Sequence, residues 1–280
     1  MKLDLQRTVI LLTIFTLGIA GSILFTSSTL NYYNLVSSYG VQTYSISPFY
    51  ELLYLLIGLL VITGIILLLI HFKLIEVVIG LFIFVSFLVL LDFFNVLFSP
   101  LFSVFGEQLT LASLALSILF IVYYFKYAGS VGMNVINIIM FITISSIVSL
   151  ALNILTAMIL IAVIAIYDYI AVFVTKHMIT LAKGLKNRYL LGGITLAAHR
   201  TTKRGTAFLG GGDMVFPMIF VDAVFQQYSV YGALFAAAGA ILGLSLILIY
   251  GKRGKAYPAM AFMGPLQLLF FAGFILLHFI

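Results

Sequence analysis

The chain has 280 residues, of which 64% are hydrophobic and only 8% are charged. A soluble domain of this size would expose one continuous apolar surface, so the composition excludes a soluble protein and indicates a polytopic membrane protein. The sequence has no cysteine and its four histidines lack the spacing of metal ligands, so we expect no disulfide, no metal and no other cofactor.

Nine apolar stretches are long enough to cross a bilayer as helices, whereas a barrel would need short alternating segments that the sequence does not contain. We therefore predict an all-α polytopic membrane protein with nine transmembrane helices. Their predicted ranges are 8–26, 52–72, 77–98, 108–125, 133–151, 155–175, 207–227, 231–250 and 259–279. Residues 27–50 and 176–206 are predicted to be polar loops. The first apolar stretch is longer than that of a signal peptide, so we expect it to be retained.

The basic residues predict the orientation of these spans. All 14 Lys and Arg fall on one side of the membrane when the N-terminus is placed in the cytoplasm, many of them in the 176–206 loop and in residues 252–255. This predicts a multi-pass protein of the cell membrane, with its N-terminus cytoplasmic and its C-terminus outside. The net charge of +6 then reflects topology and contact with anionic headgroups, and we expect no nucleic-acid partner.

Four aspartates lie inside predicted spans, namely Asp92, Asp168, Asp213 and Asp222. A carboxylate within the bilayer costs about 2.5–3.5 kcal/mol on insertion scales, so its default interpretation is functional. At 1.5 Å per helical residue, Asp168 and Asp213 both lie roughly 12–13 Å from the cytoplasmic ends of their spans. Asp92 and Asp222 lie about 27 Å from those ends, near the outer interface, where they are expected to reach headgroups or water.

The matching depth of Asp168 and Asp213 predicts one shared site on adjacent antiparallel spans, nearer the cytoplasmic side. Two carboxylates a few Å apart in a low-dielectric site hold one proton between them. The ionised carboxylate can take a proton from a water that attacks a peptide carbonyl, and the protonated one can donate to the oxyanion or to the leaving nitrogen. The pair therefore points to hydrolysis of an amide bond.

Two further segments accompany the aspartates. Gly210, Gly211 and Gly212 precede Asp213, where the lack of side chains allows close approach of a substrate backbone or a bend in the chain. The alternative for these glycines is a packing surface between helices. Pro258 opens the last apolar stretch, where it fits the first turn of a helix.

Together these segments resemble the presenilin and signal peptide peptidase family of GxGD intramembrane aspartyl proteases. Tyr167-Asp168 resembles the YD motif of that family, and Gly210-Gly211-Gly212-Asp213 resembles its GxGD motif. Residues 258–262 (Pro-Ala-Met-Ala-Phe) resemble its PALxF motif, with Met260 where the family usually has Leu.

The resemblance implies a presenilin-like fold and an aspartic endopeptidase that uses a water and no cofactor. It implies that Asp168 and Asp213 are catalytic and that Tyr167 lines the pair. The same resemblance implies that Pro258, Ala259 and Met260 shape the active site and bind substrate. Residues 1–152 would form a scaffold of five helices, and residues 153–280 would form the catalytic half with the 176–206 loop.

The implied substrates are transmembrane helices of membrane proteins or signal-peptide remnants, held in the lipid bilayer. The charge-derived orientation resembles presenilin and favours substrates whose N-termini lie outside. Because a helix hides its carbonyls, the substrate must unwind, and its exposed backbone needs new partners. The 176–206 loop or the segment before Pro258 is a candidate edge for an added strand. We expect no obligate subunit, since no long extramembrane domain is present.

Two other classes stay open at this point. A transporter or ion channel could use the paired aspartates as a proton or cation site, with the glycines and Pro258 as helix breaks. The sequence shows no convincing internal repeat, which counts against this class. Prepilin peptidases also carry GxGD but lack the proline motif, so Pro258 discriminates against them.

Several polar and small residues are predicted to serve packing alone. Asn134 and Asn137 are interpreted as interhelical hydrogen bonds or interface residues. The small residues Gly239 and Gly243, with Gly232, Ala236 and Ala240, are interpreted as a packing face of the eighth span.

Overall fold

The computed structural model describes residues 5–38, 48–101, 107–174, 192–196, 207–251 and 257–278. These residues are mostly helical and also form one two-stranded sheet. The helices of the N-terminal half are α1 (Leu5–Ser38), α2 (Pro48–His71), α3 (Ile75–Phe98), α5 (Glu107–Lys126) and α6 (Ser130–Leu150). Those of the C-terminal half are α7 (Ile154–Tyr169), α9 (Gly211–Gln227), α10 (Val230–Tyr250) and α11 (Ala259–His278). A short 3₁₀ turn, η1 (Ser99–Leu101), follows α3, and a π-helical turn, η2 (Ile170–Val174), continues α7.

Seven of the described helices are long and apolar enough to cross a membrane. Helix α2 is also apolar and has 24 residues, whereas α9 is shorter, with 17 residues. The chain is therefore a helical protein with multiple candidate membrane spans, as the composition predicts. The count of nine spans and the orientation of the termini stay predictions.

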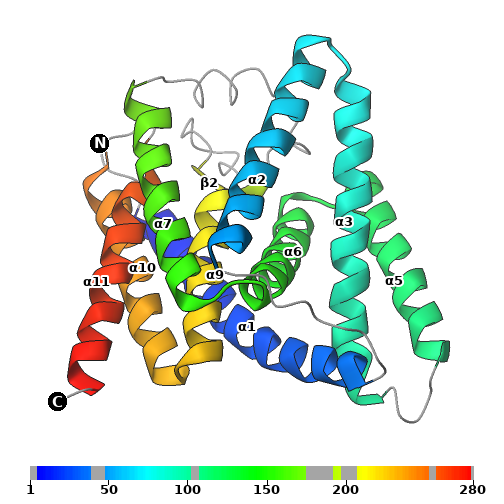
Figure 1. Cartoon of the computed structure of the whole chain (residues 1–280). Coiled ribbons are helices and arrows are strands. Elements are labelled where there is room, and N and C mark those ends of the chain that lie inside the picture. Colours follow the sequence, from blue (N-terminus) through cyan, green and yellow to red (C-terminus); the bar gives the residue numbers. More distant parts are fainter. Residues whose placement is uncertain are drawn as a thin grey trace.

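The prediction of a loop from residue 27 onward is wrong for residues 27–38, which continue α1 to a length of 34 residues. A helix of that length extends about 50 Å, well beyond the hydrocarbon thickness, so it must tilt or leave the bilayer. Figure 1 shows α1 running obliquely across the lower part of the bundle. Ser22, Thr26 and Thr29 are fully buried on this helix, so these three polar side chains face other helices.

The purely helical prediction is corrected at the start of the seventh predicted span. Residues Ala207–Gly210 form a strand, β2, which pairs in antiparallel register with β1 (Gly193–Leu196) from within the predicted 176–206 loop. The register places Gly193 opposite Gly210 and Thr195 opposite Phe208. Both strands carry β-branched or aromatic residues, which favour extended backbone. α9 begins directly after β2 at Gly211.

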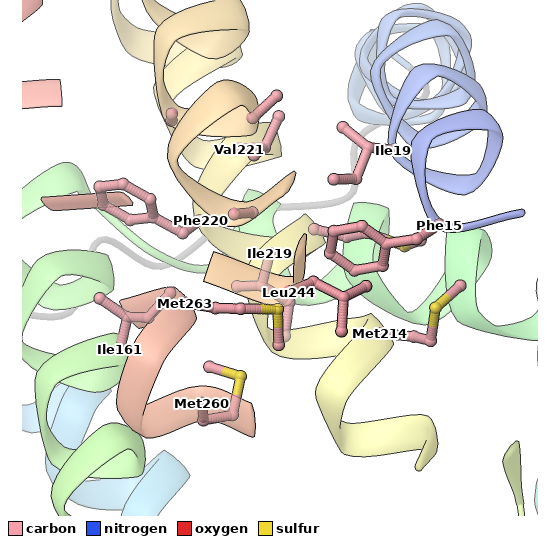
Figure 2. Close-up of a cluster of buried hydrophobic side chains, with 14 of the residues drawn as sticks. Phe15, Ile19, Ile161, Met214, Ile219, Phe220, Val221, Leu244, Met260 and Met263 are labelled. Atoms are coloured by element: carbon pink, nitrogen blue, oxygen red, sulfur yellow. The ribbon is translucent and has the colours of Figure 1, made fainter. Parts of the chain in front are cut away.

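The main core surrounds α9. Figure 2 shows Phe15 and Ile19 of α1, Phe220 of α9 and Met260 and Met263 of α11 among the side chains that fill it. In Figure 1, α7, α9, α10 and α11 gather at one side of the molecule, while α3 and α5 stand at the other with α6 between them. The helices that carry the predicted site are therefore packed against one another.

The predicted packing face of α10 is confirmed, because Gly239 and Gly243 are buried against the main chain of α11. A Cβ at Gly243 would lie 2.6 Å from the Cα of Met263, and one at Gly239 would lie 2.7 Å from the Cα of Gln267. Small residues let two membrane helices approach to backbone contact, which strengthens dispersion between them. This contact fixes α11, whose first turn reaches the candidate site.

Candidate active site

Asp168 lies near the end of α7, two residues before the π-helical turn η2 begins at Ile170. Its Oδ2 accepts a hydrogen bond from the backbone N–H of Met260 at 2.9 Å, and the N–H of Ala261 also bonds to this carboxyl group. The donors are free because the first N–H groups of a helix have no partner within it. Pro258 and Ala259 are buried at the start of α11, so the proline segment holds Asp168 by its backbone.

Asp213 lies in the first turn of α9, directly after β2, and is partly buried. The backbone of Gly210 is hydrogen-bonded to its carboxyl group. Pro217 lies four residues further along α9 and has no N–H, so the carbonyl of Asp213 is not bonded in the usual helical way. The segment around Asp213 thus combines a strand end, a helix start and a proline.

The structure brings the two aspartates close enough to interact electrostatically, although they come from α7 and α9. Helix α11 also reaches this site, because the Met260 N–H bonds to Asp168. Tyr167 precedes Asp168 on α7, and its side chain is 44% exposed. Three helices therefore contribute to one site at the end of the bundle where the hairpin lies, which is at the top of Figure 1.

The three glycines before Asp213 differ in their surroundings. A Cβ on Gly211 would overlap the carbonyl oxygen of Gly192 and touch the ring of Phe141, so only glycine fits there. At Gly210 a Cβ would lie 3.1 Å from Oδ2 of Asp213, whereas at Gly212 it would make only ordinary contact. The need for glycine at position 211 therefore comes from the close approach of the backbone at Gly192 and not from helix packing alone.

An apolar groove of about 370 Å³ adjoins the site between α7 and α11. Its lining residues from α7 are Ala162, Ala165, Ile166 and Tyr169, and those from α11 are Ala261, Pro265 and Leu268. Tyr169 and Ala261 immediately follow Asp168 and Met260 in the chain. The groove therefore leads along the two helices to the aspartates.

The expectation that Asp222 reaches headgroups or water is wrong, because its side chain is completely buried. Ser22 of α1 lies 2.9 Å from Oδ1 of Asp222, and the oblique α1 covers this part of α9. Depth along a helix does not reveal which face a neighbour covers, and this explains the error. Asp92 is partly buried and accepts a hydrogen bond from Tyr33 at 3.3 Å.

The expected interhelical hydrogen bond is present at Asn137 of α6, which accepts from the Tyr124 hydroxyl of α5 at 3.1 Å. Sequence reasoning missed a further contact, because the side chains of Asn134 and Asn137 also bind the backbone of β1. The sequence signal for this contact was the presence of two amide side chains three residues apart, which could bind the backbone of a polar loop. Residues 175–191 and 197–206, which make up most of the predicted basic loop, lie outside the described residues.

In the part of the chain that the structure describes, no group of three or more His, Cys, Asp or Glu side chains is placed to hold a metal ion. The site consists of carboxyl groups, backbone N–H donors and apolar walls. Groups of this kind can take part in acid and base chemistry.

Residues 12–277 match the family described as signal-peptide peptidase, presenilin aspartyl protease. The chain belongs to this family. The match confirms the resemblance to the presenilin and signal peptide peptidase family seen in the sequence.

The fold agrees with solved structures of a presenilin family intramembrane aspartate protease. The structure in space group C222 has 19% sequence identity and a TM-score of 0.72, and the match covers 96% of this chain and 99% of that one. The structure in space group P2 has 21% identity and a TM-score of 0.66, with 93% and 96% covered. A comparison with curated proteins gave no match. This member of the signal-peptide peptidase and presenilin family therefore has the presenilin fold over nearly its whole length.

Proposed function

We propose that this protein is an intramembrane aspartic endopeptidase of the GxGD type, which cuts peptide bonds within transmembrane helices of membrane proteins or signal-peptide remnants. The observation that carries the proposal is the meeting of Asp168 and Asp213 beside the first turn of α11. Neither residue has a basic partner among the contacts of the described residues, and carboxyl pairs of this kind share one proton.

In the proposed reaction the ionised carboxylate removes a proton from a water molecule as that water attacks the peptide carbonyl. The protonated carboxyl group donates to the carbonyl oxygen as the C=O bond becomes a single bond. Breakdown of the tetrahedral intermediate transfers a proton to the leaving nitrogen and breaks the C–N bond. The products are a carboxylic acid and an amine, and the pair again holds one proton.

The free edge of β2 supports a way to hold an unwound substrate. In an antiparallel pair, residues alternate between pointing both backbone groups at the partner strand and pointing both away. The bonds from α6 to Gly193 and Thr195 show that these residues point away from β2, so their opposite residues Gly210 and Phe208 point away from β1. None of the described residues bonds to the Phe208 backbone on that side. A substrate strand added there would run beside Asp213.

The proposed substrates enter from the bilayer along the α7–α11 groove, whose apolar walls match a transmembrane segment. We further propose that residues 1–152 are scaffold and residues 153–280 the catalytic half. In this view Tyr167, the glycines before Asp213 and Pro258 to Met260 shape the site. The enzyme would act in the cell membrane, nearer the cytoplasmic side, and without obligate subunits.

The test uses purified protein in vesicles with a fluorogenic transmembrane peptide, and mass spectrometry of the products. Wild-type protein should cut within the apolar segment, and both Asp168→Ala and Asp213→Ala should abolish cutting. Asp92→Asn is the matched control, because it removes a carboxyl group of a span outside the pair. Ion flux without cleavage would show that the protein is a carrier and not a protease. Matched substrates of both orientations test whether those with an outside N-terminus are preferred.

A further inference from the structure

The outer edge of β1 is covered by two amide side chains of α6. The Nδ2 of Asn134 donates to the carbonyl of Thr195 at 2.9 Å, and its Oδ1 accepts from the N–H of Thr195 at 3.0 Å. The Nδ2 of Asn137 donates to the carbonyl of Gly193 at 2.9 Å. The Asn134 amide thus pairs with Thr195 as a neighbouring strand would, with one donor and one acceptor.

These amides are held in fixed orientations. Asn134 is 9% exposed and Asn137 is 3% exposed, so water does not compete for their bonds. The hydroxyl of Tyr124 on α5 donates to Oδ1 of Asn137 at 3.1 Å, which leaves the Nδ2 of Asn137 directed at β1. Both asparagines lie on the same face of α6, since residues three apart are neighbours on a helix.

The two edges of the hairpin are therefore unequal. Three outward backbone groups of β1, the carbonyls of Gly193 and Thr195 and the N–H of Thr195, already have partners. On β2, the outward residues are Phe208 and Gly210, and the chain continues from Gly210 to Asp213. An open strand edge accepts any extended chain, whereas a paired edge does not.

We propose that Asn134 and Asn137 are positioning residues that close the outer edge of β1, so that a substrate strand can add only to β2, beside Asp213. This inference rests on the proposed function. It gives the N-terminal half a direct part in selecting the substrate's position. Loss of the amide bonds would release β1 from α6, and a substrate could then pair on the far side of the hairpin, where β1 and β2 separate its scissile bond from the aspartates.

Cross-linking tests this selection directly, because the native chain has no cysteine. Thr195 and Phe208 are opposite each other in the register, so their side chains project from the same face of the hairpin. A cysteine at Thr195 detects a substrate strand at the edge of β1, and a cysteine at Phe208 detects one at the edge of β2. Single cysteines at these two positions, in an Asp168→Asn background that retains substrate, would be oxidised against peptides with one cysteine at successive positions. We expect a disulfide with Phe208→Cys and none with Thr195→Cys.

The decisive variant adds Asn134→Ala. The Thr195→Cys cross-link should then rise about tenfold, since two hydrogen-bonding groups of β1 become free. The cross-link of Phe208→Cys in the same variant shows that the hairpin has folded. If Asn134→Ala does not fold, Asn134→Asp replaces it, because it keeps the acceptor for the Thr195 N–H and loses only the donor to the Thr195 carbonyl.

Cut positions give a second readout in the active enzyme. If Asn134 had a merely structural role, Asn134→Ala would lower the amount of active enzyme without moving the cut positions. Loss of edge selection should instead add new cut positions or raise KM, while cleavage still requires Asp168 and Asp213. The inference is overturned if Thr195→Cys cross-links as well as Phe208→Cys while Asn134 is present, or if Asn134→Ala changes neither cross-links nor cuts. Absence of cleavage by the wild-type enzyme would overturn the proposed function instead.

Discussion

Asp222 shows how one residue can be intramembrane and acidic without belonging to the site. The single hydroxyl proton of Ser22 cannot serve both neighbours of its oxygen, the carbonyl of Ile19 and Oδ1 of Asp222, which each lie 2.9 Å away. The hydroxyl of Thr26 and Oδ2 of Asp222 are both buried without a partner among the described residues. A proton on Asp222 would let Ser22 bond to Ile19 and still accept from Asp222, so we interpret this residue as a neutral tie between α9 and α1.

The first prediction follows from this hydrogen-bond arrangement. Asp222→Asn retains an acceptor and a donor of the same size, so its free energy of unfolding should stay within about 1 kcal/mol of wild type. Asp222→Ala removes both groups and leaves a cavity, and should cost about 2–4 kcal/mol. Unfolding in mixed micelles measures both. A loss in Asp222→Asn as large as in Asp222→Ala would show that the negative charge itself is needed.

A second residue-scale prediction concerns Gly211. A methyl group there collides with the Gly192 carbonyl, so Gly211→Ala should push the hairpin away from α9 and displace Asp213. A misplacement of about 1 Å can cost on the order of a hundredfold in rate, and kcat for the transmembrane peptide should fall at least about tenfold. Gly273→Ala is the control, because a Cβ at that position of α11 meets nothing within 4 Å. Unchanged kcat in Gly211→Ala would contradict the close approach.

At the scale of elements, the apolar stretches predicted most helices to within a few residues. α3, α10 and α11 begin and end within four residues of the predicted spans. The hairpin was missed because Ala207 to Gly210 are apolar and continue into α9 without a polar break, so hydropathy alone does not separate strand from helix. The extension of α1 was missed because its polar residues 27–34 read as a loop, whereas Thr29 and its neighbours on the buried face contact other helices. Both errors concern tertiary contacts that the sequence pattern does not encode.

The α7–α11 groove carries the element-scale prediction. Ala162→Phe should fill the groove without touching Asp168, which lies six residues along α7. If substrates enter here, KM should rise about tenfold, equivalent to ~1.4 kcal/mol of binding, with kcat nearly unchanged. Val163→Phe adds the same ring at the next position, which is exposed and does not line the groove, and should leave KM unchanged. Equal KM values for the two variants would exclude the groove as the path of the substrate.

At the scale of the whole molecule, the proximity of Asp168 and Asp213 could be predicted because depth and motif agreed on residues from two different helices. The contact of Asn134 with β1 could not be predicted, because its partner is the backbone of a segment about sixty residues away in the chain. Residues 1–152 and 153–280 contact each other at several places, among them α6 with β1 and α1 with α9. Mutations in the first 152 residues are expected to alter catalysis through these links.

The orientation of the bundle gives the last prediction. Figure 1 shows the α9–α10 turn at the lower end of the bundle, opposite the hairpin, while α5 rises toward the upper end. Tyr127 follows α5 and Tyr231 is the second residue of α10, and both are well exposed. If the basic residues set the topology, Tyr127 is cytoplasmic and Tyr231 lies outside.

In this cysteine-free chain, a membrane-impermeant maleimide should label Tyr231→Cys in intact cells and Tyr127→Cys only after permeabilisation. The reverse pattern would invert the orientation and place the aspartates nearer the outer side, and labelling of both in intact cells would contradict the predicted order of spans.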